Sequence, residues 1–258
     1  MPFEKCTKVR EQIELHKSLA LVYVKKRYAP AFSKIYHEYW NDRMCQIAKL
    51  KPGVRVLDLG CGTGILFPAL VKKKYCVTGL DLSYEMLSAG RNDGLHIARI
   101  CADGSHIPLA DNTFDAVFCR GSIHHMPDLV TCFSEISRIL INGGQLIFSE
   151  PCDDSILNRW ARTIMYSKSN EFHEKDKGFR RRNIIALFRQ FGFDIIYSRG
   201  FGFFGYIFAA FPDKISIMNK IPGNCFITRL LISLDHLIGK LPFLEIMALH
   251  WMVNARKL

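Results

Sequence analysis

The chain has 258 residues, of which 49% are hydrophobic, enough apolar material for one sizeable α/β core. Its formal net charge of +11 fits a basic surface in solvent, a phosphate-bearing substrate, an anionic membrane surface or nucleic acid. The nine cysteines stand singly, which favours free thiols in a reducing compartment over disulfides. No signal-peptide pattern opens the sequence, and the longest uncharged apolar run, residues 200–212, is shorter than the roughly 20 residues that span a bilayer. We therefore expect a cytoplasmic protein without a transmembrane helix.

Residues 7–50 show helical periodicity that is broken once, at Ala29–Pro30. One helix face in this region is expected to carry Ile35, Tyr39, Met44, Ile47 and Leu50. After residue 53 the pattern changes to short apolar runs separated by helical segments. Five of these runs are predicted to be strands: RVLDLG, CVTGLD, LHIARICAD, FDAVFCR and GGQLIFSE. Near-continuous apolar strands that alternate with helices indicate a parallel sheet covered on both faces.

The second half of the chain continues the sheet. A helix from Asp128 is expected to end at residues 142–144. A basic helix then leads to a sixth strand near FDIIYSRG, and HWMVNARK predicts a seventh. We therefore predict an α/β fold, a doubly wound, seven-stranded, mostly parallel sheet in a single domain. Its parts are an N-terminal helical cap (1–50), a core (51–202), an apolar insertion (203–244) and the last strand (245–258).

The stretch VLDLGCGTG, residues 56–64, joins the first strand to a helix through three glycines. Bare backbone N–H groups at such a turn suit part of a nucleotide-like cofactor, although a tight turn also needs small residues for structural reasons alone. Three acids, Asp58, Asp81 and Asp103, come at or near the carboxyl ends of the first three strands. Open α/β sheets bind ligands at that edge, and an acid after the second strand can accept both hydroxyls of a ribose.

In order and spacing, four segments resemble the class I S-adenosylmethionine-dependent methyltransferases, within the small-molecule group that includes the quinone-biosynthesis enzymes. The segments are VLDLGCGTG, GLDLSYEML, ADGSHIPLADNTFDAVFCRGSIHHMPD and NGGQLIFSEP. The resemblance covers about residues 35–200 and the final strand. It implies a Rossmann-like methyltransferase fold with S-adenosyl-L-methionine as the cofactor.

The same resemblance implies the cofactor contacts. The glycine turn would pass the methionine part, Asp58 would reach its amino group, and Asp81 would hold the ribose. A sulfonium cofactor carries positive charge, so carboxylates and aromatic faces suit its surroundings. The predicted cofactor-binding residues are Asp58, Gly60, Cys61, Gly62, Gly64, Asp81, Leu82, Met86, Asp103, Gly104, Arg120 and Gly121.

Methyl transfer is an in-line displacement that needs a base only if the acceptor loses a proton. The candidates are His124 and His125, which follow the fourth strand, and Glu150, which ends the fifth. If the two histidines are extended, they point in opposite directions, so only one faces the substrate and a shared metal is not expected. We favour His124. Tyr36 and Tyr39 are candidates to close over the cofactor, and core packing is the alternative for both.

The insertion concentrates the excess apolar composition. Between residues 226 and 240, one helix face is predicted to carry Phe226, Ile227, Leu230, Leu231, Leu234, Leu237 and Ile238. The remaining surface is predicted to carry Thr228, Arg229, Asp235 and His236. Two interpretations stay open: a lid packed on the sheet, or a contact with an anionic membrane that admits a lipid-like substrate. The basic run 180–182 likewise suits either a solvated face or phosphate recognition.

The leading hypothesis is a methyltransferase acting on a small, apolar or lipid-like acceptor. An RNA or other polyanion methyltransferase fits the charge, but CRGSIHH stands where amino-methylating nucleic-acid enzymes usually carry an Asn/Asp-Pro-Pro-aromatic motif. A non-catalytic cofactor-binding subunit is the third possibility. A dehydrogenase is disfavoured by the glycine spacing and by Asp58. A metalloid methyltransferase needs thiols at the pocket mouth, where only Cys152 and Cys225 are candidates.

Overall fold

Seven strands form one sheet in the computed structural model, which describes residues 13–14, 20, 22–91, 94–155 and 180–258. The strand order is β3-β2-β1-β4-β5-β7-β6. The bounds are β1 Arg55–Leu59, β2 Cys76–Asp81, β3 Ala98–Cys101, β4 Phe114–Arg120, β5 Leu140–Pro151, β6 Phe193–Phe201 and β7 His250–Lys257. β7 runs antiparallel to β5 and β6, and the other four neighbouring pairs are parallel. The predicted seven-stranded, mostly parallel sheet is confirmed. Residues 1–12 of the predicted N-terminal cap lie outside the described residues.

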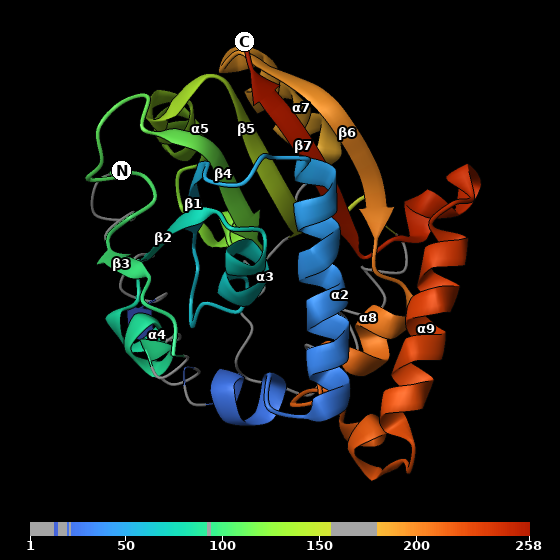
Figure 1. Cartoon of the computed structure of the whole chain (residues 1–258). Coiled ribbons are helices and arrows are strands. Elements are labelled where there is room, and N and C mark those ends of the chain that lie inside the picture. Colours follow the sequence, from blue (N-terminus) through green and yellow to red (C-terminus); the bar gives the residue numbers. More distant parts are fainter. Residues whose placement is uncertain (1–12, 15–19, 21, 92–93, 156–179) are drawn as a thin grey trace.

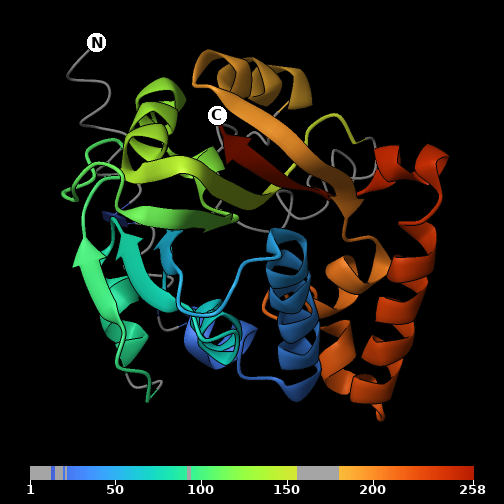
Figure 2. The same ribbon diagram turned by 45° about the horizontal axis from the view of Figure 1, so that its top comes forward.

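Helices cover both faces of the sheet (Figures 1 and 2). On one face, α5 (Leu129–Ile139) and α7 (Arg181–Gln190) bury residues such as Phe133 and Phe188 against the strands. On the other, the core is closed by α2 (Ala31–Ala48), α3 (Phe67–Lys72) and α8 (Phe204–Ala209). The short helix α4 (Tyr84–Ala89) packs against β2 and β3. Burial on both faces explains the near-continuous apolar strands.

The predicted face of α2 is only partly correct. The helix begins directly after Pro30, which agrees with the predicted break, and Met44 and Ile47 are buried as expected. Ile35, Tyr39 and Leu50 are half-buried instead. The fully inward positions that the pattern missed are Phe32, Tyr36, Trp40 and the polar residues Ser33, His37 and Asn41. These polar side chains are hydrogen-bonded to backbone carbonyls inside the protein. Hydrophobic periodicity alone therefore could not locate the buried face.

The predicted end of the helix after Asp128 is wrong. Asp128 caps α5 as expected, and its carboxylate accepts a hydrogen bond from the N–H of Thr131 at 3.1 Å. The helix, however, ends at Ile139, because Leu140 is already extended and pairs with Phe114 of β4. Residues 142–144 therefore lie inside β5, at the place where its register with β4 shifts.

The insertion folds into α8, the 3-10 turn η4 (Ser216–Lys220), the longer helix α9 (Asn224–Ile238) and the 3-10 segment η5 (Pro242–Met247). α9 packs against α2 and α8, and Figure 1 shows it along the outer edge of the molecule. Among the described residues, no helix is long and apolar enough to cross a bilayer.

The arrangement predicted for α9 is only partly correct: Arg229 and His236 are exposed as expected, but two polar residues are buried and several apolar ones are exposed. Thr228 and Asp235 were expected on the surface, yet they are only 0% and 4% exposed. On the expected apolar face, Phe226, Leu230 and Leu237 are 66%, 54% and 60% exposed. An amphipathic helix normally places these two classes the other way round.

Asp235 is buried because its carboxylate is hydrogen-bonded inside the protein. Its carboxylate accepts hydrogen bonds from the N–H groups of Phe203 and Gly205, both at 3.1 Å, at the start of α8. The Tyr36 hydroxyl of α2 lies 3.5 Å from the same group. Burial raises the pKa of Asp235 from its ordinary value, and the backbone hydrogen bonds oppose that rise. The acid thus fastens α9 to α8 and α2 through a polar contact.

Candidate functional site

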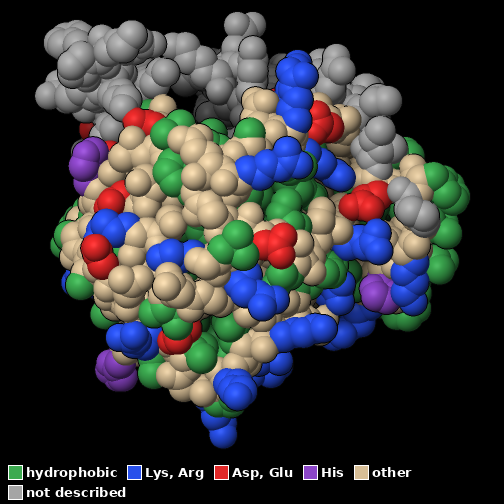
Figure 3. Space-filling model, turned by 90° about the horizontal axis from the view of Figure 1, so that it is seen from above, with side chains coloured by type: hydrophobic (Ala, Val, Ile, Leu, Met, Phe, Trp, Pro, Cys, Tyr) green, Lys and Arg blue, Asp and Glu red, His purple; other side chains and the backbone are tan. Residues whose placement is uncertain are grey.

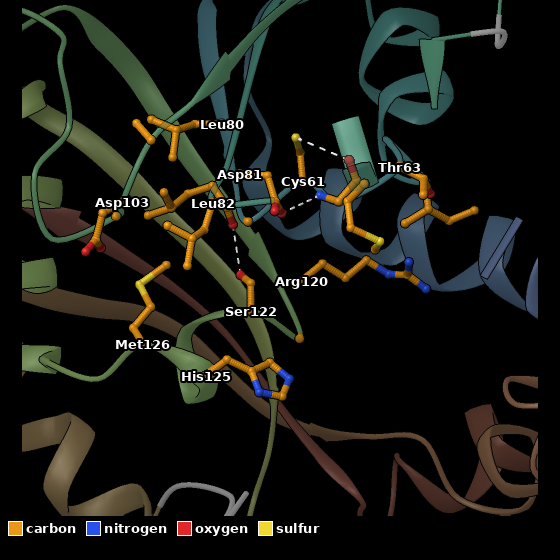
Figure 4. A pocket seen from close by; sticks show the side chains of 18 of the residues that line it. Cys61, Thr63, Leu80, Asp81, Leu82, Asp103, Arg120, Ser122, His125 and Met126 are labelled. Atoms are coloured by element: carbon orange, nitrogen blue, oxygen red, sulfur yellow. Dashed lines mark hydrogen bonds between the residues drawn. The ribbon is translucent and has the colours of Figure 1, made fainter. Parts of the chain in front are cut away.

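An open pocket with about 970 Å³ of empty space lies at the carboxyl ends of β1, β2, β3 and β4. Figure 4 shows Asp81, Arg120 and His125 around the same space. The predicted cofactor contacts that line it are Gly60, Cys61, Gly62, Asp81, Leu82, Met86, Asp103, Gly104, Arg120 and Gly121.

The glycine turn lacks side chains because the end of β4 packs directly on it. Gly60 has φ +72°, and a Cβ there would lie 2.3 Å from the Cβ of Ser122. The Ser122 hydroxyl donates a hydrogen bond to the carbonyl of Leu59 at 2.8 Å, which ties the two segments together. Gly64, with φ +85°, does not line the pocket and packs against Phe67 instead. Any larger residue at Gly60 would therefore be strained and would displace β4 from the turn.

Asp81 organises the pocket floor from the end of β2. One carboxylate oxygen accepts the N–H of Gly62 at 2.7 Å, and the other accepts the N–H of Ser83 at 2.8 Å. These two backbone N–H groups fix the direction of the Asp81 carboxylate in the lining of the pocket. Asp103 makes a similar local contact with the N–H of Ser105 at 2.8 Å.

Asp58 and Arg120 each hold a buried polar atom without a hydrogen-bond partner among the described residues: Oδ2 of Asp58 and Nε of Arg120. Burial raises the pKa of Asp58 to about 7, while the nearby Arg120 guanidinium opposes the rise and Asp81 adds to it. Burial likewise lowers the pKa of Arg120 from its ordinary value. Arg120 lines the pocket, whereas the predicted cofactor contact Asp58 is not among the lining residues. An unsatisfied acid near an unsatisfied cation suits a ligand that carries both an ammonium and a carboxylate.

Arg120 is held by α2. Its guanidinium lies 4.0 Å from the ring centroid of Trp40 and donates to Nδ1 of His37. His37 Nε2 lies 3.0 Å from the carbonyl oxygen of Ala210, which makes Nε2 the protonated nitrogen and Nδ1 the acceptor. Burial and the adjacent guanidinium hold the pKa of His37 well below its usual range. A neutral imidazole therefore fixes the arginine.

The aromatic wall of the pocket differs from the predicted one. Tyr36 and Tyr39 do not line it; Tyr23 and Tyr28, from the π-helical turn η1 (Tyr23–Arg27) and the residue after it, do. Between them Arg27 forms an ion pair with Asp213 of the insertion, at 2.6 Å. The sequence signal for this wall was the aromatic and basic stretch YVKKRY, which resembles an ordinary helix turn. The lining also includes residues that the sequence analysis did not predict: Leu59, Thr63, Ile65, Leu80, Ala102, Ser122, Met126 and Pro127.

The two candidate histidines lie in a 3-10 turn, η3 (Ile123–His125), so the expectation of an extended segment is wrong. Their ring centroids are 3.9 Å apart. His125 lines the pocket. His124 is absent from the lining residues, and its Nδ1 lies 2.6 Å from Oε2 of Glu150.

Glu150, which also does not line the pocket, supports this turn from the end of β5. Its Oε1 accepts the N–H groups of Ser122 and Ile123, at 2.8 and 3.0 Å. With its Nδ1–H directed at Glu150, a neutral His124 ring carries its lone pair on Nε2. The carboxylate therefore fixes the position and the tautomer of the imidazole beside His125.

The basic run and the two candidate cysteines lie apart from this pocket. Arg181 starts α7, and its guanidinium Nε donates to the sulfur of Cys152. None of Arg181, Cys152 and Cys225 is among the lining residues. In the described part of the chain, no group of three or more His, Cys, Asp or Glu side chains is arranged to hold a metal ion.

The raised pKa of Asp58 predicts a specific dependence of stability on pH. A raised pKa in the folded state means that the stability from the bound proton is full below the ordinary value of 3.8 and is lost as pH rises through about 7. Relative to Asp58→Asn, we expect the wild-type free energy of unfolding to fall by roughly 4 kcal/mol between pH 4 and pH 8. Urea titrations of both proteins measure it. Parallel pH profiles would contradict the assigned burial of this acid.

Comparison with known proteins identifies the central part of the chain. Residues 57–148 match the family model described as methyltransferase domain. A demethylmenaquinone methyltransferase of Corynebacterium urealyticum is 38% identical over 112 residues, which cover 43% of this chain and 47% of the relative. The chain thus spans about half the length of the curated relatives it matches.

Two solved structures share the fold. The [4+2]-cyclase SpnF has a TM-score of 0.61 at 20% identity, over 85% of this chain and 80% of that chain. The Haemonchus contortus phosphoethanolamine N-methyltransferase 2, in complex with S-adenosyl-L-methionine, has a TM-score of 0.58 at 22% identity, over 85% of this chain and 52% of that chain. Together with the family match and the strand order, these findings agree with the resemblance drawn from the motifs: residues 57–148 match a methyltransferase domain, and the chain has the fold that these structures share.

Proposed function

We propose that this pocket binds S-adenosylmethionine and that the protein transfers its methyl group to a small, apolar, lipid-like acceptor. The observation that carries the cofactor assignment is the pair of unsatisfied buried groups on Asp58 and Arg120. The methionine part of the cofactor presents an ammonium to the first and a carboxylate to the second. Asp81 then holds the ribose, and Asp103 lies beside the adenine amine. When bound, the cofactor supplies a methyl group on a positively charged sulfur.

The residues of the chain supply alignment and a dry site rather than covalent chemistry. Tyr23, Tyr28 and Met126 give the pocket an apolar wall for the acceptor. His125 lines that space, so we assign it, in place of His124, as the base for an acceptor that loses a proton. His124 and Glu150 act as positioning residues, because the Glu150 carboxylate holds the turn on which both histidines lie.

The choice of a lipid-like acceptor rests on two kinds of support. The curated relatives with the matching segment include demethylmenaquinone methyltransferases, at 38% identity over 112 residues. In addition, the exposed face of α9 presents Phe226, Leu230, Leu234 and Leu237 to solvent. An exposed apolar row of this kind is typical of a surface that contacts a membrane or a partner.

We infer that an anionic bilayer covers the α9 face. Exposed cations accompany its apolar side chains: Lys220 before the helix, Arg229 on it and Lys240 after it. Figure 3 shows hydrophobic side chains beside Lys, Arg and His side chains at the right-hand edge, where α9 and η5 lie in Figure 1. This combination is typical of interfacial helices, in which apolar burial and attraction to anionic headgroups add together.

The methyl-transfer proposal is tested with methyl-labelled S-adenosylmethionine and fractionated cell extract. We expect label in the organic-solvent phase. Asp81→Ala should reduce it, because cofactor affinity falls by roughly 1.5–3 kcal/mol when charge-assisted hydrogen bonds are removed. The matched control is Asp194→Ala, which removes an exposed acid at the start of β6. This variant should transfer as much label as the wild type.

The same experiment separates the two alternatives. Label in the RNA fraction would replace the lipid-like acceptor with a polyanion. Cofactor binding by calorimetry without label in any fraction would indicate a non-catalytic cofactor-binding subunit.

The membrane contact is tested by flotation with phosphatidylcholine vesicles that contain phosphatidylglycerol. We expect the protein to float with them, and salt should weaken the association without eliminating it, since apolar burial is not screened. Leu230→Ser combined with Leu237→Ser should abolish flotation, because both side chains lie on the α9 face. Val130→Ser, which removes a comparably exposed side chain from α5, should not. If the wild-type protein does not float with the vesicles even at low salt, the proposal is contradicted and the insertion is a soluble lid.

A further inference from the structure

A second pocket, with about 820 Å³ of empty space, lies between α2, the end of β6 and the last turn of α9. It shares no lining residue with the methyl-transfer pocket. It lies close to the α9 face, because Lys240 lines the pocket while its neighbour Leu241, like Leu237 one turn earlier, is exposed. Neither the motifs nor the comparisons assign any ligand to this pocket.

Four basic side chains from three elements line the pocket: Arg43 from α2, Arg199 from β6, and His236 and Lys240 from the end of α9. The hydroxyl-bearing residues Tyr39 and Tyr197 join them. All six can donate hydrogen bonds toward a ligand. Segments far apart in the sequence therefore bring one kind of charge to one concave site, where the field of several cations is focused.

Few negative charges oppose these cations. Glu245 lies 3.4 Å from Arg199 and also accepts the N–H of Gly200 at 2.7 Å. The carboxylate of Asp235 is occupied by the two backbone N–H groups of the α8 cap. One of the three permanent cations is thus paired, and the net charge of the pocket stays positive.

Arg43 and Lys240 carry the unbalanced charge. The guanidinium of Arg43 donates only to neutral groups among the described residues, Gln46 at 2.9 Å and the Tyr197 hydroxyl at 3.4 Å. Lys240 forms no ion pair with a described carboxylate. Partial burial lowers the pKa of His236, and the charges of Lys240 and Arg43 lower it further. The two cations that act on this imidazole, Lys240 and Arg43, therefore lie close to the same site.

We propose that this pocket binds a phosphate group, either the headgroup phosphate of a lipid or a soluble phosphate compound. A tetrahedral anion with several acceptor oxygens matches donors that converge from three elements, and a guanidinium fork binds phosphate in a bidentate manner. A planar carboxylate would leave part of this donor set unused. The inference does not depend on methyl transfer, because the two pockets share no lining residue.

Binding to inorganic phosphate is measured first, by NMR titration of the soluble wild-type protein. We expect saturable shifts of residues around the pocket. Arg43→Gln together with Lys240→Gln should weaken binding by about tenfold or more, because two charge-assisted contacts are lost. Lys72→Gln, an exposed lysine on α3, is the matched control and should bind as the wild type does. Cofactor binding, measured in the same samples, should be unchanged in all variants, so a misfolded variant or a failed cofactor assignment is recognised separately.

Vesicle flotation then distinguishes the two sources of phosphate. If the double variant also loses association with phosphatidylglycerol vesicles, the pocket holds a lipid headgroup. If it loses phosphate binding but floats normally, the pocket holds a soluble phosphate compound. Equal phosphate titrations for the wild type and the double variant, or no saturable shifts near the pocket, would overturn the proposal.

Discussion

The placement of Arg120 connects the sheet, the N-terminal helix and the pocket. The side chain leaves the end of β4 and is held between Trp40 and a neutral His37, both on α2. His37 Nδ1 can accept the hydrogen bond from Arg120 because the other ring nitrogen, Nε2, donates to the carbonyl of Ala210 at the end of α8. One buried cation therefore depends on three elements from distant parts of the sequence. Its counterpart, Asp58, is buried without a hydrogen-bond partner for one oxygen among the described residues. Arg120 lines the pocket, whereas Asp58 is not among the lining residues.

Such an arrangement is costly in the free protein and favourable with the right ligand. Burying charged groups without full compensation opposes folding, and the raised pKa of Asp58 expresses that cost. A ligand with an ammonium and a carboxylate would satisfy both groups at once. The same reasoning explains why α2 buries the polar residue His37, which positions Arg120.

In the insertion, too, a buried polar residue fixes the position of a helix. Asp235 uses its carboxylate to cap α8, which directs the polar side of α9 inward and leaves Leu230 and Leu237 outward. The exposed apolar face is therefore a consequence of how the helix is fastened. The basic pocket at the end of α9 lies next to this face, so charge and apolar surface meet at one edge of the molecule.

The sequence predicted the sheet well because strand burial and the glycine turn are local signals. VLDLGCGTG and the acids after the first three strands correctly indicated which loops meet at one edge of the sheet. The inward positions of α2 and α9 were predicted poorly, because His37, Thr228 and Asp235 are buried through tertiary hydrogen bonds or packing that no periodicity reveals. The wall formed by Tyr23 and Tyr28 was missed for a related reason: its place depends on the Arg27–Asp213 ion pair, between residues 186 positions apart.

The most direct measurement of the central claim is the affinity for S-adenosylmethionine at pH 6 and pH 7.5, by calorimetry, for the wild type and Asp58→Asn. With a pKa of about 7, Asp58 is about one tenth ionised at the lower pH and about three quarters ionised at the higher one. If the carboxylate holds the ammonium of the cofactor, the wild type should bind roughly eightfold more tightly at pH 7.5, with protons released on binding. Asp58→Asn should bind weakly and equally at both values. Equal wild-type affinities at the two pH values, or unimpaired binding by Asp58→Asn, would contradict the account.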